Sequence, residues 1–256
     1  MLIDVGTPST QLLVSCLYYG HSIPVEVFRS PILSADSYSM QISCKAAEYM
    51  SLYKYLDKPK HILHIGANWG QETAEYIKEF KGSLQSITYI ECIPDMVKRL
   101  KEHTDQYKHH VEINNIEALV SDSVGSRVKF YIANNECGSS SMYPPNPSEW
   151  AWAHVSFNGE IELTTTTCDA LVENGTLPKE YDTLVLDTQG SELNVLRGMG
   201  RLLPSVKQMI IEYSRRAFYK GGVLLPELSH YLQSNNMVPK FIPTGDHGDA
   251  VFTRAQ

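Results

Sequence analysis

Short apolar runs alternate with stretches of helical periodicity along most of the chain. Six apolar runs that end near glycine, acidic or turn-forming residues predict buried strands: residues 61–65, 86–90, 114–121, 182–186, 208–213 and 249–253. Apolar residues spaced three and four apart predict a helix after most of these runs. This alternation is typical of an α/β fold, in which helices cover both faces of a doubly wound, mainly parallel sheet.

The first 60 residues precede this alternation, and we interpret them as an N-terminal extension of a main domain over residues 61–256. Residues 11–19 and 23–28 predict a hairpin, and an apolar stripe predicts a helix over residues 36–56. The structural interpretation of this extension is packing against the main domain. The functional one is a substrate cap or an oligomer interface, and the sequence leaves both open.

The middle of the chain interrupts the regular pattern. Val128, Phe130 and Ile132 alternate with polar residues, which predicts a strand forming a hairpin with the strand over residues 114–121. Residues 134–160 predict a long loop, and its aromatic residues favour packing over disorder. A loop of this length is interpreted as a lid or acceptor-binding surface, or as a plain packed excursion.

Candidate chemistry gathers at the carboxyl ends of the predicted strands. Gly66 and Gly70 follow the first strand and open a helix, so the backbone there can approach a ligand closely. Glu91, Asp187 and Glu212 each lie at the end of a later strand. Ligands of such sheets bind beyond the carboxyl ends of the strands, so we expect these residues to converge on one crevice.

The spacing within the glycine turn bears on the class of ligand. A dinucleotide fingerprint requires glycine at the positions that Asn68 and Gln71 occupy. The observed Gly66-x-x-x-Gly70 spacing is similar to the first motif of S-adenosylmethionine (SAM) methyltransferases. An NAD(P)-dependent oxidoreductase on a Rossmann-like sheet is the alternative, and a tight turn without a ligand is the structural interpretation.

Composition narrows the classes of partner. The 256 residues carry a formal net charge of −7, which argues against a general nucleic-acid binder. No apolar run is long enough to span a bilayer, and the N-terminus lacks the basic start and cleavage site of a signal peptide. The five cysteines are widely spaced without a C-x-x-C pair, which suits reduced thiols. These features predict a cytoplasmic protein without a membrane span.

Eight short motifs follow one another between residues 60 and 254. They are HIGANWGQET, the acid of YIECIPD, EALVSDSVG, GSSSM, TTCDALVENG, LDTQGSELNVLRGM, IIEYS and GDAVFTR. In this order they resemble the FkbM-type methyltransferases, a branch of the class I SAM-dependent fold. The resemblance implies a Rossmann-like, seven-stranded sheet with its last strand antiparallel and SAM as cofactor. It also implies methylation of a hydroxyl oxygen on a sugar, a glycan or a natural product.

The resemblance also implies roles for individual residues. It places the ribose diol on the two carboxylate oxygens of Glu91. The residues that it implies along SAM are Gly66, Ala67, Asn68, Gly70, Glu91, Cys92, Ala118 and Leu119. His64 stands where these enzymes usually carry an acid close to the SAM ammonium, and a neutral imidazole there can accept a hydrogen bond but adds no charge. The structural interpretation of His64 is a buried core histidine, with Asp187 meeting the ammonium instead.

Methyl transfer to an alcohol requires an aligned acceptor and a base for its proton. Asp187 is the first candidate base, with binding of the SAM ammonium as its rival role; Glu212 is the second and His154 the third. Glu192 is interpreted as an acid that favours the helix dipole. An oxygen-rich metal site is conceivable but lacks fixed spacing, so no metal ligand is predicted; it would use Asp187, Glu212, Asp246, His247 and Asp249. The remaining alternative is a SAM-fold binding module that has lost catalysis.

Overall fold

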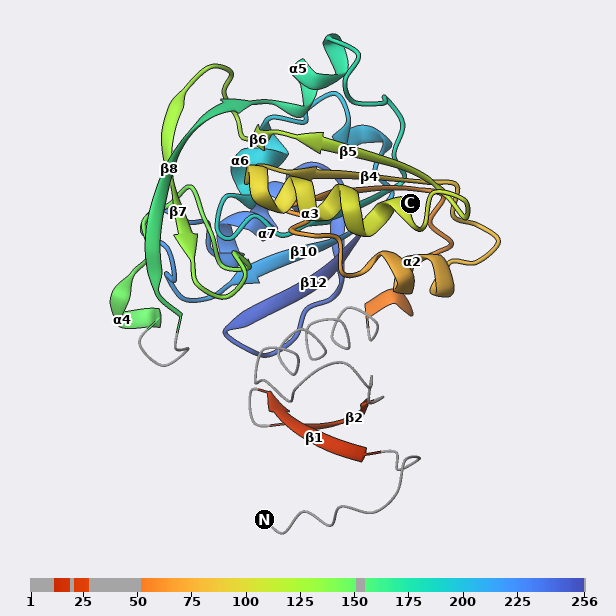
Figure 1. Ribbon diagram of the computed structural model, residues 1–256, viewed down its shortest axis with the longest axis horizontal. Helices are drawn as coiled ribbons and strands as arrows, with labels where there is room; N and C mark the ends of the chain where they lie inside the picture. Colours follow the sequence, from red (N-terminus) through yellow and green to blue (C-terminus); the bar gives the residue numbers. More distant parts are fainter. Residues whose placement is uncertain (1–11, 19–20, 28–51, 151–154, 256) are drawn as a thin grey trace. The chain divides into compact units, whose positions relative to one another are not determined.

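The computed structural model describes residues 12–18, 21–27, 52–150 and 155–255, and the chain divides into two compact units between Ser51 and Leu52 (Figure 1). In the first unit, β1 (Leu12–Tyr18) pairs antiparallel with β2 (His21–Val27). This pairing confirms the predicted hairpin. Most of the helix predicted over residues 36–56 lies outside the described residues.

The second unit contains a seven-stranded sheet with the order β11-β12-β10-β9-β3-β4-β5. Its strands are β3 (His61–Ile65), β4 (Ser86–Glu91), β5 (Glu112–Glu117), β9 (Thr183–Leu186), β10 (Gln208–Ser214), β11 (Met237–Phe241) and β12 (His247–Arg254). β12 runs antiparallel to both of its neighbours, and the strands from β10 to β5 are parallel. The predicted seven-stranded, mainly parallel sheet with an antiparallel last strand is therefore confirmed.

Helices cover both faces of this sheet. α2 (Thr73–Glu79) and α3 (Pro94–Asp105) lie in front of it in Figure 1, and α6 (Glu192–Arg197) and α7 (Leu225–Ser234) lie behind. α5 (Cys168–Glu173) is capped by Thr167, whose hydroxyl accepts from the N–H of Ala170 at 3.0 Å. Every second residue of the strands packs into the large core beneath α5, α6 and α7, because side chains alternate between the faces of a strand.

A smaller sheet corrects the prediction for the middle of the chain. Its strands are β6 (Leu119–Val120), β8 (Phe157–Thr166) and β7 (Arg127–Ala133), in that spatial order. β7 pairs antiparallel with β8, so the predicted hairpin of residues 127–132 with residues 114–121 is wrong. The predicted loop over residues 134–160 instead includes α4 (Pro147–Trp150) and the start of β8. β8 forms because its residues up to Thr164 pair with β7, with one register shift, and Thr165 and Thr166 pair with β6.

Two other features complete the second unit. β11 was absent from the prediction; it adds an edge strand beside β12, and a short 3-10 helix (Leu203–Ser205) precedes β10. Residues 52–60 also go with this unit, because Asp57 and Gln208 exchange two hydrogen bonds of 2.6 and 3.2 Å. The division into units therefore precedes the predicted domain boundary at residue 60. Among the described residues, no helix is both long and apolar enough to cross a membrane.

Candidate active site

The turn after β3 is built for close contact with the neighbouring strand β9. Gly66 has a φ of +81°, and a Cβ atom placed on it would lie 1.7 Å from the carbonyl oxygen of Asp187. No side chain fits there, so glycine is required both for conformation and for space. Asn68 and Gly70 also have positive φ values, of +49° and +74°. The turn therefore presents its backbone directly beside Asp187.

Glu91, at the end of β4, holds this turn in place. Its Oε2 accepts the N–H of Asn68 at 2.9 Å, and its Oε1 accepts the N–H groups of Cys92 and Ile93 at 2.8 and 2.9 Å. Burial raises the pKa of Glu91, and the same three backbone donors oppose that rise. The side chain of Cys92 also hydrogen-bonds to Glu91, so groups of the protein hold this carboxylate from several sides.

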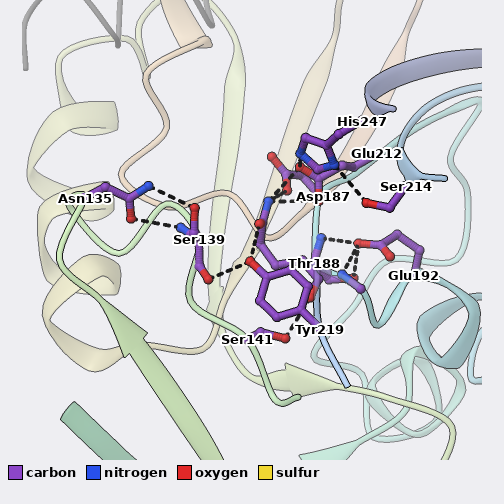
Figure 2. Close-up of polar contacts among 12 residues, drawn as sticks. Asn135, Ser139, Ser141, Asp187, Thr188, Glu192, Glu212, Ser214, Tyr219 and His247 are labelled. Atoms are coloured by element: carbon purple, nitrogen blue, oxygen red, sulfur yellow. Dashed lines mark hydrogen bonds and ion pairs between the residues drawn. The ribbon is translucent and has the colours of Figure 1, made fainter. Parts of the chain in front are cut away.

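Two carboxylates meet at the ends of β9 and β10. The side-chain nitrogen of Gln189 donates to Asp187 Oδ1 at 2.6 Å and to the two oxygens of Glu212 at 2.7 and 2.8 Å. Glu212 Oε1 also lies 3.1 Å from His247 Nε2, and His247 Nδ1 lies 2.9 Å from Ser214 Oγ. Figure 2 shows this run of contacts from Asp187 to Ser214. The predicted convergence of strand-end acids is thereby realised for Asp187 and Glu212.

The carboxylate pair is tied to the loop that follows β7. The Tyr219 hydroxyl lies 2.7 Å from Gln189 Oε1 and 2.8 Å from the carbonyl oxygen of Ser139, and these two acceptors share its one proton. Ser139 is in turn bonded to Asn135 (Figure 2). Ser141 Oγ donates to the backbone carbonyl of Gln189 at 2.7 Å. Tyr219 is 30 residues from Gln189 and 80 residues from Ser139 in the sequence, and no local pattern predicted these contacts.

Comparison with known proteins shows the family to which this chain belongs. The methyltransferase FkbM domain matches residues 64–238, which is more than half of the chain. The chain belongs to the FkbM methyltransferase family. This confirms the resemblance drawn from the sequence motifs, and the protein is a methyltransferase.

Two relatives and one solved structure illustrate this family. The 2-O-methyltransferase NoeI of Sinorhizobium fredii is 26% identical over 212 residues, covering 79% of this chain and 83% of NoeI. The hexuronic acid methyltransferase AglP of Haloferax volcanii is 38% identical over 71 residues, 27% of this chain and 29% of AglP. A crystal structure of methyltransferase FkbM from Methylobacillus flagellatus aligns with 14% identity and a TM-score of 0.46, over 86% of this chain and 55% of that one.

Two residues predicted to lie along SAM, Ala118 and Leu119, pack into different clusters of this FkbM methyltransferase. Leu119 joins an apolar cluster with Ile93 and Phe130, against which Cys92 packs. Ala118 packs instead against the core beneath α5, α6 and α7, and its N–H donates to the carbonyl of Glu91 at 3.0 Å. Contact of these residues with the cofactor stays a prediction.

Ala67 and His64 are both buried. The N–H of Ala67 donates to the carbonyl of Ile90 at 3.2 Å, which anchors the glycine turn to β4. The ring of His64 lies between Tyr76 of α2 and Tyr89 of β4, and its Nδ1 is 3.3 Å from the Tyr76 hydroxyl. This packing matches the core interpretation of His64, and its contact with a cofactor stays a prediction.

Glu192 is a fully enclosed acid in this methyltransferase. Its Oε1 accepts from the N–H and the hydroxyl of Thr188 and from the N–H of Gly190, at 3.0, 3.2 and 3.1 Å. Burial raises the pKa of Glu192 to about 8, with a further rise from the charges of Glu212 and Asp187. Glu192 therefore shapes the turn after β9 and carries a proton near neutral pH, beyond the helix-dipole role that the sequence suggested.

An aromatic cluster lies beside the carboxylates. Trp150, from α4, packs against Phe157, Phe218 and Tyr219, with ring centroids 5.4 to 5.6 Å apart, and its Nε1 donates to the carbonyl of Phe218 at 2.8 Å. Since Tyr219 also contacts Gln189, the cluster is connected to the acids through that glutamine. His154, the third candidate base, lies outside the described residues.

The candidate metal ligands are distributed unevenly. Glu212 and His247 are in contact, while Asp246 is exposed and pairs with Arg216 at 3.8 Å. Within residues 52–150 and 155–255, no three histidine, cysteine or acidic side chains are arranged to hold a metal ion. The carboxylates of the site are therefore described through their hydrogen bonds to protein groups.

Proposed function

We propose that this methyltransferase transfers the methyl group of SAM to a hydroxyl oxygen of a carbohydrate. The observation that carries the proposal is the pair of Asp187 and Glu212, joined by Gln189 at adjacent strand ends, with Asp187 in backbone contact with Gly66. Such a pair can take up the proton that a hydroxyl loses during methylation. The names of the relatives NoeI, a 2-O-methyltransferase, and AglP, a hexuronic acid methyltransferase, support oxygen and sugar chemistry.

The donor set around the glycine turn fits SAM. Glu91, at the end of β4 and bonded to the glycine turn, would face the ribose of bound SAM. The apolar cluster with Leu119 and Ile93 suits a purine ring, and Asp187 offers a carboxylate to a cationic group. Bound SAM would supply an activated methyl group on a sulfonium. The protein must then align the acceptor and receive its proton.

Asp187 is the base in this proposal. It is half-exposed, whereas Glu212 is 4% exposed and is engaged by Gln189 and His247. Asp187 would receive the proton that the acceptor hydroxyl loses as that oxygen is methylated. The aromatic cluster around Trp150 provides an apolar surface for the face of a sugar ring.

The first experiment tests the cofactor by calorimetric titration of the full chain with S-adenosylhomocysteine (SAH), NAD and NADP. We expect SAH to bind and the dinucleotides not to bind. Glu91→Gln should weaken SAH binding about tenfold, because an amide N–H then faces backbone donors. Glu117→Gln is the matched control, since Glu117 is opposite Glu91 on β5 and is exposed. Dinucleotide binding without SAH binding would instead favour the oxidoreductase.

The second experiment tests the acceptor with methyl-labelled SAM and a panel of neutral sugars, hexuronic acids and hydroxylated non-sugar compounds. We expect label in a sugar, at an ether oxygen located by NMR. Asp187→Asn should reduce kcat about 100-fold or more, as expected for loss of a general base. A rise in KM for SAM at unchanged kcat would assign Asp187 to the ammonium instead. Label in the non-sugar compounds alone would refute the carbohydrate acceptor.

A further inference from the structure

Gln189 occupies a strained and enclosed position between the two carboxylates. Its φ is +54°, in the left-handed region that residues other than glycine seldom adopt, and its side chain is 5% exposed. The surroundings must hold it there, because such a backbone conformation is unfavourable for a residue with a side chain. Residues with strained backbone of this kind cluster at active sites and ligand-binding segments.

The contacts of Gln189 fix which end of its amide faces the acids. The nitrogen lies within 2.8 Å of oxygens on both Asp187 and Glu212, while Oε1 accepts the hydroxyl of Tyr219. A reversed amide would place Oε1 against two carboxylates, which is repulsive. The backbone carbonyl is held separately by Ser141. Gln189 is thus oriented from three sides by residues of different elements.

We propose that Gln189 is a positioning residue for methyl transfer: its amide nitrogen holds Asp187 and Glu212 together as an ionised pair, and Tyr219 fixes that amide. This inference rests on the proposed function of the site. Two carboxylates side by side, Glu212 buried and Asp187 partly exposed, repel each other, and one of them would otherwise take up a proton. A neutral amide that donates to both carboxylates offsets this repulsion without adding a positive charge that would weaken the base.

Several ionisable groups face this pair, so its protonation is shared among neighbours. They come from α6, β12 and the loop after β10: Glu192, Asp249, His247 and Tyr219. The pH dependence of the reaction is therefore a property of the cluster. Gln189 is the member that cannot titrate, and its substitution changes the cluster without removing an acid.

The test compares kcat as a function of pH in the full-length protein and in Gln189→Glu. A third carboxyl group in place of the donor should move the acidic limb of the profile upward by about one pH unit. Tyr219→Phe, which leaves the amide in place but unfixed, should give a smaller upward shift. Tyr181→Phe is the control, because Tyr181 is equally buried and donates only to the neutral Thr88, at 3.1 Å. Profiles of Gln189→Glu and Tyr219→Phe that coincide with wild type would overturn the proposal.

A second measurement does not depend on activity or on the stability of the Gln189 variant. We expect the side-chain amide protons of Gln189, assigned by NMR, to exchange slowly in the wild-type protein and faster in Tyr219→Phe than in Tyr181→Phe. Rapid exchange in wild type would refute the network. If SAH binds but no methyl transfer is found, the proposed function fails while this measurement still decides whether Gln189 is held as described.

Discussion

Gly66→Ala is the substitution whose cost can be worked out most directly. The new methyl group would lie 1.7 Å from the carbonyl oxygen of Asp187, where ordinary contact begins at 3.4 Å. The Cβ atom is fixed to the backbone and the oxygen it meets is a backbone oxygen, so no side-chain rotation can relieve the clash. The turn must therefore move away from β9. The residue would also keep a φ of +81°, which L-residues avoid.

The expected loss of stability has two parts. A left-handed alanine costs about 1–2 kcal/mol. Separation of the turn from its neighbours breaks the hydrogen bond from Asp187 to Ile65, of 3.0 Å, and the one from Gly66 to Ile90, of 2.9 Å. Each buried loss costs about 1–3 kcal/mol, so the total is about 3–8 kcal/mol. This is a large share of the stability of an ordinary domain, about 5–15 kcal/mol.

Gly175→Ala provides a control with the same backbone conformation and no clash. Gly175 has a φ of +79°, and a Cβ atom there would meet nothing within 4 Å. Its substitution should cost only about 1–2 kcal/mol, and the gain from a stiffer unfolded chain is the same for both variants. Urea unfolding followed by tryptophan fluorescence measures the second unit, because the three tryptophans are at positions 69, 150 and 152.

The difference between the two variants isolates the contact between Gly66 and Asp187. If both variants lose the same free energy of unfolding, the glycine serves only the turn conformation, and the packing argument is refuted. If Gly66→Ala is folded at low temperature, it should also bind SAH more weakly than Gly175→Ala, since the displaced turn carries the proposed ligand contacts. Equal SAH binding by the two folded variants would contradict the placement of the ligand.

Three further substitutions test other parts of the site and fold. Burial raises the pKa of Glu192 from an ordinary 4.5 to about 8 in the folded protein. The stability of the wild-type protein should therefore fall as the pH rises from 4.5 to 8. Glu192→Gln should flatten this fall in melting temperatures measured from about pH 5 to 9. Trp150→Phe loses the hydrogen bond to Phe218 and should cost about 1 kcal/mol in urea unfolding, with acceptor KM raised and SAH binding unchanged. Thr167→Ala removes the cap that accepts from Ala170 and should destabilise α5 by about 1 kcal/mol, as seen in urea unfolding.

The sequence predicted the strand-end acids for a physical reason. Parallel strands of a doubly wound sheet all end at one edge, so placing Asp187 and Glu212 at strand ends already brings them together. β8 (Phe157–Thr166) was missed because its residues alternate only weakly: nine of the ten are at least partly exposed, Thr165 alone is buried, and glutamates interrupt the apolar positions. A strand that buries so little has no clear period to detect.

The contacts that set the chemistry of the acids were beyond prediction for a different reason. Gln189, Tyr219 and Ser139 come from separate elements, and their meeting depends on how the loop after β7 packs against the sheet. The proton on Glu192 likewise follows from its enclosure and from its charged neighbours, neither of which a local motif encodes. A sequence motif can therefore name the acids of such a site, whereas their roles depend on which neutral donors reach them. That is why a glutamine, rather than another acid, is the informative residue to change.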